Sequence, residues 1–588
     1  MPDVAVCTLQ ELRDQGQVLA TVGDRRVLVL EHDGRIRAVD NRCPHMGFPL
    51  QRGTVDDGIL TCHWHHARFE LSGGCALDLF ADDVPTYETE VRDGTVHVAT
   101  APRPRDEQAH ALAKLDQGLE HQLSLVLAKA AITLEETGNR VQALDRAARF
   151  GVRNRSRGWS SGLSILTCLA NLMPHLDPVD RPRALFHGLV HVAARTAGSP
   201  PSFDIDPLID PDDDPVRLLG WFRRFVETRS EDAAERVLAT AIDQGLDAHA
   251  VADLVYAACT DHRYLDEGHT LDFATKAFEL VGHVGWDAAG EVLPALVPPL
   301  VQATRMEETS SWRTPIDVAA AVEAATPGFL EALDVGAARL QQDWVDHAKV
   351  AAVVMDADPE ESLSLLVEQA GAGVPMAELS AAVAYAAALR AAHFPTSNEH
   401  GDWDTVHHTF TFANAVDQTV RSYPSRLLAR GILDAAASVH LERFLNVPKR
   451  PLPDGRHPDA TPVALLATFD THGQVDEAGE LTAAMVAAGR TDEVVRTLAK
   501  GVLREDAGFH EFQILDAAVM QARTFAGRPE AGHILVGAAR FLAAQFPTVR
   551  ARRQTFDIAL RLQQGGAIHV PDESHGHRGS SPASRSAT

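Results

Sequence analysis

Few features of this sequence point to a membrane or to an oxidising compartment. It has no run of 18 or more apolar residues, which excludes a spanning helix of the usual kind. Six cysteines in 588 residues are too few for a disulfide framework. The first residues, MPDVAVCTLQELRDQG, lack the basic and then apolar order of a secretory signal. We therefore expect a cytoplasmic protein without a membrane partner.

An excess of positive charge is also missing. The chain has 54 Lys and Arg against 81 Asp and Glu, a net charge of −27, which makes the electrostatics of nucleic-acid binding repulsive. We expect no nucleic-acid partner. With 45% apolar and 23% charged residues the composition is that of a soluble globular protein, and 588 residues are too many for one hydrophobic core. The chain should divide into several domains.

Short strand-like segments occupy the first hundred residues. They are rich in Val, Ile, Leu and Phe and include QVLATVG, RRVLVLEHDG, GILTCHW and TVHVAT. Asp-Gly pairs at 33–34, 57–58 and 93–94 separate several of them, and this dipeptide is the strongest short signal for a β-hairpin. The pattern predicts a small antiparallel all-β domain at residues 1–100.

The pattern then changes to Ala- and Leu-rich segments of helical period. The proline-containing stretch APRPRDEQ predicts a linker at 101–108, because proline continues neither a strand nor a helix. Residues 109–565 predict a large all-α domain. The polar, Gly/Ser/Pro-rich end predicts a disordered tail at 566–588. The expected fold class is therefore multidomain, an all-β domain followed by an all-α domain.

Parts of the helical region resemble one another. Residues 267–281 align with 406–420 through a shared His-Thr-x-x-Phe-Ala, and 531–544 form a weaker third copy. The separations are too uneven for a tight solenoid. We predict three or four related multi-helix modules packed into one α domain.

Two Cys/His motifs in the β region predict a metal centre. Cys43-x-His45 is followed, after sixteen residues, by Cys62-x-x-His65. Each half supplies one thiolate and one imidazole, a set that suits an iron–sulfur centre in which the two cysteines hold one iron and the two histidines the other. The rival is a structural Cys₂His₂ zinc site. Zinc fingers usually pair Cys with Cys and then His with His on a helix, so this order favours iron.

These motifs resemble those of the Rieske family, and the resemblance covers about residues 1–100. The family's C-x-H-x-G and C-x-x-H loops correspond to Cys43–Gly47 and Cys62–His65, and the following ARFELSGG has Phe69 and Gly74 in the expected places. The resemblance implies a [2Fe–2S] cluster bound by Cys43, His45, Cys62 and His65. It also implies electron transfer with an external reductase or ferredoxin.

Departures from the family indicate the type of cluster. Phe48 and Trp64 stand where respiratory-chain members place a pair of disulfide cysteines, and Ala67 and Phe69 stand where they place Ser and Tyr. Without those hydroxyls the cluster sulfurs lose hydrogen bonds, which lowers the reduction potential. We expect a low-potential cluster of the ferredoxin or oxygenase type. His66 replaces the common Gly after the second histidine and is expected to face solvent.

The helical region lacks the iron site of ordinary Rieske oxygenases. Asp404-x-x-His407 is not followed by a second histidine five residues on, and no strand-rich half follows the β domain. The region is nevertheless rich in histidine, with His187 and His191 on one helical face and a repeated histidine at the aligned positions. We predict that His269, His408 and His533 converge. The candidates for a second, non-haem iron site are His187, His191, His262, His269, His408 and His533.

Two functions are compatible with the sequence. In the first, the low-potential cluster passes electrons to a substrate site in the helical domain, which is metal-dependent, uses oxygen and takes a small molecule. In the second, the protein is a non-catalytic electron carrier or redox sensor, and the helical domain is a scaffold for docking a protein, as repeat-like α domains often are. No catalytic residue is assigned from the sequence.

Overall fold

In the computed structural model the described residues are 2–155, 158–210, 214–308, 316–341, 344–566 and 568. They divide into two compact units. The first unit contains Met1–Gln117, Leu123–Ala130 and the stretch from Thr555, and the second contains Gly118–Gln122 and Ala131–Gln554. Most of the predicted tail at 566–588 lies outside the described residues. Among the described helices, none is long and apolar enough to cross a membrane.

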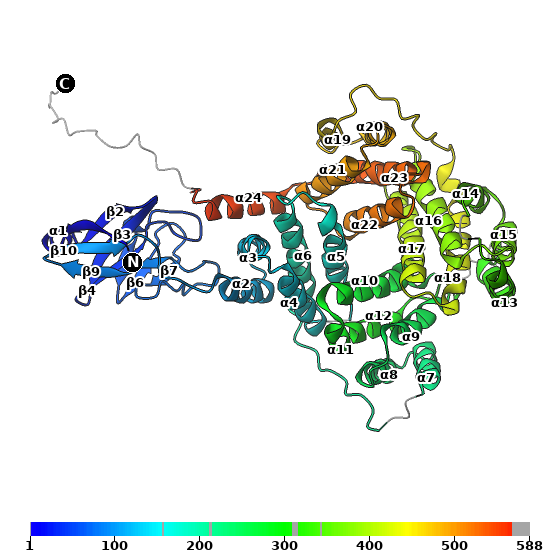
Figure 1. The fold of residues 1–588 in the computed structure, drawn as a ribbon, viewed down its shortest axis with the longest axis horizontal. Helices are drawn as coiled ribbons and strands as arrows, with labels where there is room; N and C mark the ends of the chain where they lie inside the picture. Colours follow the sequence, from blue (N-terminus) through cyan, green and yellow to red (C-terminus); the bar gives the residue numbers. More distant parts are fainter. Residues whose placement is uncertain are drawn as a thin grey trace, which may run out of the picture. The chain divides into compact units, whose positions relative to one another are not determined.

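The first unit contains three antiparallel sheets (Figure 1, blue). Their orders are β1-β10-β9, β2-β3-β4-β8 and β5-β6-β7. The strands are β1 (Asp3–Thr8), β2 (Gln17–Val22), β3 (Arg25–His32), β4 (Arg35–Asp40), β5 (Thr54–Asp56), β6 (Ile59–Thr61), β7 (Arg68–Glu70), β8 (Thr86–Tyr87), β9 (Thr89–Arg92) and β10 (Thr95–Ala99). A short helix, α1 (Leu9–Gln15), follows β1. The predicted all-β N-terminal region is confirmed.

The three Asp-Gly pairs close three hairpins. They connect β3 with β4, β5 with β6 and β9 with β10. Both residues of every pair have positive φ, for example 48° at Asp33 and 68° at Gly34. Type I′ turns require this conformation at two adjacent positions, and Asp and Gly adopt it at low cost. The turn chemistry therefore sets the strand register on either side of the cluster-binding motifs.

A large helical region follows the sheets. Its helices as far as residue 302 are α2 (Glu107–His121), α3 (Ser124–Glu136), α4 (Arg140–Arg153), α5 (Ser161–Leu172), α6 (Arg181–Thr196), α7 (Pro215–Glu227), α8 (Glu231–Asp243), α9 (Ala248–Thr260), α10 (His269–Val284), α11 (Ala289–Val292) and α12 (Val297–Gln302). The remainder are α13 (Val318–Gly336), α14 (His347–Asp356), α15 (Pro359–Gly371), α16 (Met376–Ala392), α17 (Asp402–Ser422), α18 (Ala429–Leu441), α19 (Pro462–Thr468), α20 (Val475–Ala487), α21 (Thr491–Arg504), α22 (Phe509–Thr524), α23 (Pro529–Gln545) and α24 (Ala551–Gln563). The predicted helical region is confirmed.

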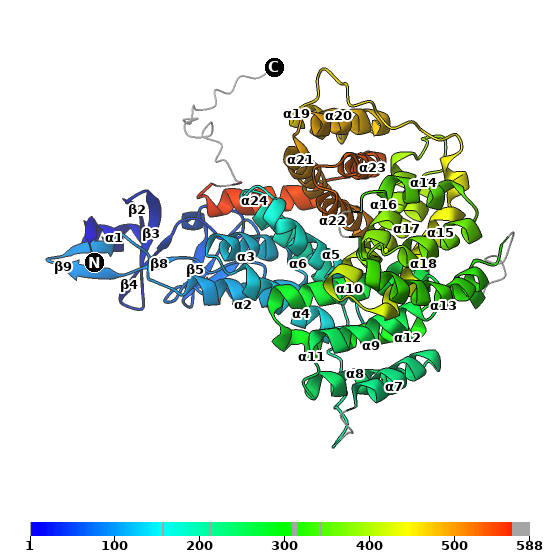
Figure 2. The ribbon, with the colours of Figure 1, turned by 45° about the vertical axis from the view of Figure 1, so that its right-hand side comes forward.

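Helix α17 lies at the centre of the second unit. It packs against α10, α16, α18 and α22, and Figures 1 and 2 both show these helices beside one another. Its side chains are buried on nearly every face, as expected for a helix surrounded by others. Because α10 and α22 both pack on α17, polar side chains near the N-terminal ends of the three helices are brought together.

Candidate functional sites: the cluster loops and a three-histidine group

Two loops beside the smallest sheet carry the predicted cluster ligands. Cys43 and His45 lie between β4 and β5, and Cys62 and His65 lie between β6 and β7. Each loop closes on itself through its backbone, since Gly47 N donates to Cys43 O over 2.8 Å and Cys62 N donates to the carbonyl of residue 67 over 2.8 Å. The two cysteines are part of the hydrophobic core, with exposed fractions of 2% and 1%.

The two imidazole rings lie next to each other, and so do the two thiols. The rings of His45 and His65 lie edge to face with their centroids 4.8 Å apart. The thiols of Cys43 and Cys62 lie within hydrogen-bonding distance of each other, and this bond raises the pKa of Cys43 and lowers the pKa of Cys62 to about 6. A pair of adjacent thiols and a pair of adjacent imidazoles fit a cluster whose two irons have different ligands.

His45 provides a second indication of a bound group. Its Nδ1 atom is buried and has no hydrogen-bond partner among the described residues. Burial, followed by the neighbouring His65 and Lys129, lowers the pKa of His45 to about 4. Neutral imidazole is the form that binds a metal, and a buried nitrogen without a partner is costly unless it binds one. The residues of this site therefore fit a [2Fe–2S] cluster.

The backbone conformation at residue 66 explains why the family usually has glycine there, where this chain has His66. His66 has a φ of 61°, in the left-handed region. Glycine adopts that conformation freely, whereas other residues pay about 1 kcal/mol or more. In the first loop the residue with a positive φ, 80°, is a glycine, Gly47. The side chain of His66 is exposed, as the sequence predicted.

Residues distant in sequence support the first loop within the same unit. The ammonium of Lys129, from α3, donates a hydrogen bond to the carbonyl oxygen of Pro44. Pro44 lies between the two predicted ligands of that loop. Arg42 donates to Leu562 O at the end of α24 over 2.9 Å. The compact unit that holds the cluster loops thus includes helical residues beyond the predicted boundary at residue 100.

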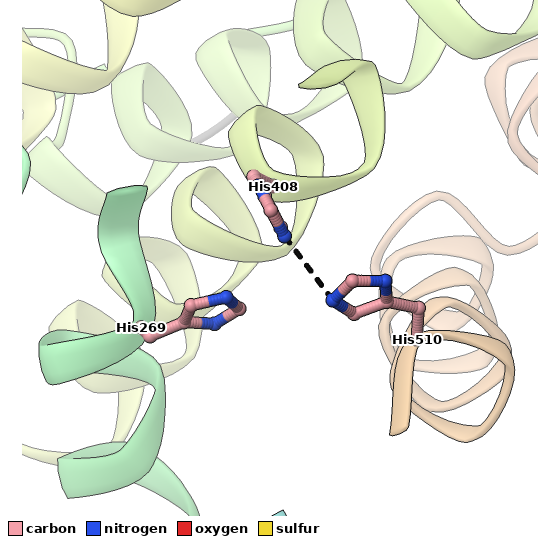
Figure 3. A group of neighbouring side chains, drawn as sticks. All are labelled: His269, His408 and His510. Atoms are coloured by element: carbon pink, nitrogen blue, oxygen red, sulfur yellow. Dashed lines mark hydrogen bonds between the residues drawn. The ribbon is translucent and has the colours of Figure 1, made fainter. Parts of the chain in front are cut away.

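Three histidines meet in the second unit. His269 begins α10, His408 lies in the second turn of α17, and His510 lies at the start of α22. Figure 3 shows the three rings turned toward one another. One ligand atom from each lies within 4.8 Å of the others, so the three side chains form a group that could hold a metal ion after small adjustments of the rings. The ring centroids of His269 and His408 are 4.6 Å apart, and those of His408 and His510 are 4.9 Å apart.

Two carboxylates orient these imidazoles. Glu267 Oε2 lies 3.2 Å from His408 Nδ1, and Asp404 Oδ1 lies 3.2 Å from His510 Nδ1. The two Nε2 atoms consequently face each other at 3.2 Å. With metal–nitrogen bonds of about 2.0–2.1 Å, that separation gives an N–metal–N angle of about 100°. Carboxylate-held imidazoles are the usual supporting arrangement of histidine metal sites.

The surroundings keep two of the rings neutral. Burial, assisted by His408 and His510, lowers the pKa of His269 to about 3. Burial, assisted by His510, lowers the pKa of His408 to about 4. At neutral pH both rings are therefore uncharged, and a metal ion does not have to displace protons from them.

The backbone that leads to His269 is strained. Tyr264, Asp266 and Glu267 all have φ values between 46° and 57°, in the left-handed region. The segment is held in place by hydrogen bonds from Tyr264 N to Asp434 Oδ2 at 2.7 Å and from Thr304 N to Asp266 Oδ1 at 2.8 Å. Each left-handed residue costs about 1–2 kcal/mol, and such strain gathers at functional sites. Glu267, at the end of this segment, lies against His408.

The other predicted histidines do not join this group. His187 Nε2 lies 3.2 Å from Leu503 O and His191 Nε2 lies 3.1 Å from Ala507 O. Both residues are buried, and Nδ1 of His187 has no hydrogen-bond partner among the described residues. His262 lies between Glu227 and Glu307. His533 Nδ1 lies 2.7 Å from the Tyr385 hydroxyl. The predicted convergence of His269 and His408 is present in the structure, but the third member is His510 in place of His533.

His510 was missed because no local signal marks it. It lies 102 residues after His408, in the segment GFHEF, and outside the three similar segments at 267–281, 406–420 and 531–544. The sequence marks Asp404 only through Asp404-x-x-His407, which lacks the second histidine of an oxygenase iron site. The contact of α17 with α22 makes both residues part of one site.

The fold of the first unit, with its adjacent pair of thiols and adjacent pair of imidazoles, defines an iron–sulfur electron-transfer domain. The family model of the Rieske [2Fe–2S] domain matches residues 3–88. The ferredoxin component of the alkene monooxygenase system of Xanthobacter autotrophicus is 32% identical over 18% of this chain and 88% of that protein. The ferredoxin subunit of 3-phenylpropionate/cinnamic acid dioxygenase of Photorhabdus laumondii is 34% identical over 17% of this chain and 97% of that protein.

The chain therefore belongs to the Rieske family through its N-terminal domain, and the predicted resemblance is confirmed. Human apoptosis-inducing factor 3 is 29% identical over 16% of this chain and 16% of its own length. All these matches concern the Rieske region and leave the helical region unassigned. The Rieske domain implies a [2Fe–2S] cluster and electron transfer.

Proposed function

We propose that this protein is an oxygen-dependent oxidoreductase in which the Rieske cluster, bound by Cys43, His45, Cys62 and His65, supplies electrons to a metal-dependent substrate site in the helical region. The metal ligands are His269, His408 and His510, and the metal is non-haem iron. The single observation that carries the proposal is the convergence of three imidazoles from α10, α17 and α22, two of them held by carboxylates.

The chemistry of the ligands favours a redox metal. Imidazole suits iron, copper and zinc, and a site with three protein ligands leaves positions open for oxygen and substrate. The proposed reaction inserts one oxygen atom of O₂ into a substrate and releases the other as water. It consumes two electrons and two protons, and the electrons come one at a time from the cluster, which is reduced by an external reductase or ferredoxin.

Two features support a low potential for the cluster. Ala67 and Phe69 are fully buried in the core around the cysteines and carry no hydroxyl. Fewer hydrogen bonds to the cluster sulfurs favour the oxidised state. The two bacterial relatives that this chain matches over most of their length are named as ferredoxin parts of oxygenase systems, which agrees with a donor of low potential.

Metal analysis of the full-length protein tests the proposal. After anaerobic reconstitution with iron and sulfide, we expect more iron per chain than the cluster accounts for. A His269→Ala/His510→Ala variant should lose that excess and keep the electron paramagnetic resonance signal of the dithionite-reduced cluster. His533→Ala is the matched control, because His533 bonds to Tyr385 outside the group, and it should retain both.

The same samples separate the two candidate functions. Reduced protein mixed with oxygen should reoxidise more slowly when the three-histidine site is removed. A wild-type protein that holds only cluster iron and no other transition metal contradicts the proposal and leaves an electron carrier with a docking domain.

A further inference from the structure

A stripe of polar side chains runs along one face of α10. Its members recur every three or four residues, so they lie on the same side of the helix. They are His269, Asp272, Lys276, Glu279 and His283. Asp272 and Lys276 each have an exposed fraction of 1%, and a buried charge is costly unless other polar groups balance it. This α10 stripe starts at the three-histidine group, because His269 is one of the three.

Helix α22 has a second polar stripe, which meets the first. His510, Gln513 and Asp516 follow one another at three-residue spacing, and Gln513 and Asp516 are buried. The ammonium of Lys276 donates a hydrogen bond to Asp516 Oδ2, across the space between the two helices. Both stripes therefore begin at members of the three-histidine group and meet at this ion pair, about two helical turns further on.

The far end of the stripes reaches the surface at Glu279, whose side chain has an exposed fraction of 22%. Asn171, from α5, donates from Nδ2 to Glu279 Oε2 over 2.7 Å and to Asp516 Oδ2 over 3.3 Å. Because Lys276 bonds to the same two oxygens, the two carboxylates lie side by side. Asn171 Oδ1 lies 2.7 Å from Nε2 of the half-buried His283. A partly exposed carboxylate thus lies next to a buried one.

Between the ion pair and the histidines, buried polar atoms are left without partners. His407 belongs to this region, because its Nε2 lies 2.9 Å from Gln513 Oε1 and its ring centroid lies 4.7 Å from that of His510. Four atoms have no hydrogen-bond partner among the described residues: Asp516 Oδ1, Asp272 Oδ2, Gln513 Nε2 and His407 Nδ1. Buried polar atoms that the protein leaves unpaired are usually bonded to ordered water. Four of them in one region predict internal water.

The two buried carboxyl groups are suited to carry protons. Burial raises the pKa of Asp272 to about 7, against the ammonium of Lys276 and the nearby amide of Gln513. Burial also raises the pKa of Asp516, against the same ammonium. Cys168, from α5, faces these charges, and burial raises the pKa of its thiol well above the ordinary value, so it stays neutral. A group whose pKa is near the pH of the solution both accepts and releases protons.

We propose that internal water lies between the two stripes and that this water, together with Asp272 and Asp516, conducts protons from the surface at Glu279 to the three-histidine site. The inference rests on the proposed function, because the reaction at that site consumes two protons for each oxygen molecule. A proton that leaves Asp272 toward the site is replaced through water from Asp516. Asp516 regains one from solvent by way of Glu279. Lys276 keeps its charge, which balances the charge of the carboxylates.

Hydrogen–deuterium exchange of the Asp272 carboxyl group tests the path and needs no second metal. The infrared C=O band of a protonated carboxyl group shifts when deuterium replaces the proton. In full-length protein at about pH 6, below the pKa of Asp272, the band is assigned as the one that Asp272→Asn loses. In heavy water this band should shift at least about 100-fold faster than the amide hydrogens of α10 exchange, because buried amides wait for local opening and a water path does not.

Three variants locate the path. Glu279→Gln removes the proton acceptor at the surface end and should slow the exchange of the Asp272 carboxyl group by about 10-fold or more. Glu279→Asp keeps a carboxylate there and should restore most of the wild-type rate. Thr275→Val is the matched control on α10, because the Thr275 hydroxyl bonds to Leu271 O and Thr419 Oγ1 outside the two stripes. It should leave the exchange unchanged.

A second measurement tests delivery to the site in protein that holds the second metal. After reduction and mixing with oxygen, Asp272→Asn should reoxidise about 10- to 100-fold more slowly than the wild type, because a lost proton donor costs at least that much. Its rate should also fall more in heavy water than the wild-type rate does, since proton delivery then limits the reaction. Thr275→Val should match the wild type in both respects.

The outcomes separate this inference from the proposed function. Carboxyl exchange no faster than that of the α10 amides, or exchange that Glu279→Gln leaves unchanged, overturns the path. Unchanged reoxidation of Asp272→Asn overturns delivery to the site. If Asp272→Asn fails to fold, Asp272→Glu, which moves the band, assigns it instead. Rapid exchange in a protein without the second metal supports the path while contradicting the metal site, and a second metal with slow exchange does the reverse.

Discussion

Asp404 and Glu267 should strengthen metal binding although neither is a proposed ligand. Each carboxylate lies 3.2 Å from an Nδ1 atom, of His510 and His408 respectively, and so turns the Nε2 atoms toward the site. Loss of such a supporting carboxylate typically weakens metal affinity by about 10- to 100-fold. The two carboxylates are about half exposed, which lowers their effect. We therefore expect the lower limit, about 10-fold for Asp404→Asn.

The double variant Asp404→Asn/Glu267→Gln should lose up to about 100-fold, or about 2.7 kcal/mol, if the two effects add. Competition with a fluorescent zinc chelator measures the affinity on the full-length protein, with the cluster present in every sample. Asp402→Asn is the matched control on the same helix, because its carboxylate accepts a hydrogen bond from Glu399 N instead. It should leave the affinity unchanged.

A double variant that binds zinc within twofold of the wild type would refute this reasoning. It would mean that packing alone orients the rings. Loss of affinity in Asp402→Asn as well would show that the change acts through the start of α17 and not through the imidazole contact.

Two further predictions concern separate parts of the chain. Lys129→Met removes the ammonium at Pro44 O and should lower the reduction potential of the cluster by about 50 mV, because a nearby positive charge favours the added electron; an unchanged spectroelectrochemical titration would contradict this. Gly268→Ala places a Cβ at a φ of 90°, 2.7 Å from Phe412 Cβ, and should lower the free energy of unfolding by about 1–3 kcal/mol in denaturant titrations and weaken metal binding at His269, whereas a neutral effect would contradict the strained geometry.

The β domain and its predicted ligands were accessible to sequence reasoning because their signals are local. An Asp-Gly pair such as Asp33-Gly34 needs only two adjacent residues with positive φ to form its turn. The spacing from Cys43 to His45 spans a single short loop, as does that from Cys62 to His65. The helices of the second unit likewise follow from the 3.6-residue period of each segment alone.

The three-histidine group was accessible only in part. A shared position in two similar segments marked His269 and His408, and the same argument selected His533, which lies against Tyr385. Similar segments need not have similar neighbours, because the partner of each helix is decided by packing. His510 enters the site only because α22 packs on α17.

By itself, the sequence determined which segments are strands and helices, where the hairpins turn, and which four side chains are available for a cluster, since each depends on residues a few positions apart. The tertiary structure alone decided that Lys129 contacts the first cluster loop and that His510 joins His269 and His408. These features depend on contacts between residues far apart in the chain, and such contacts are set by how complete helical faces pack together.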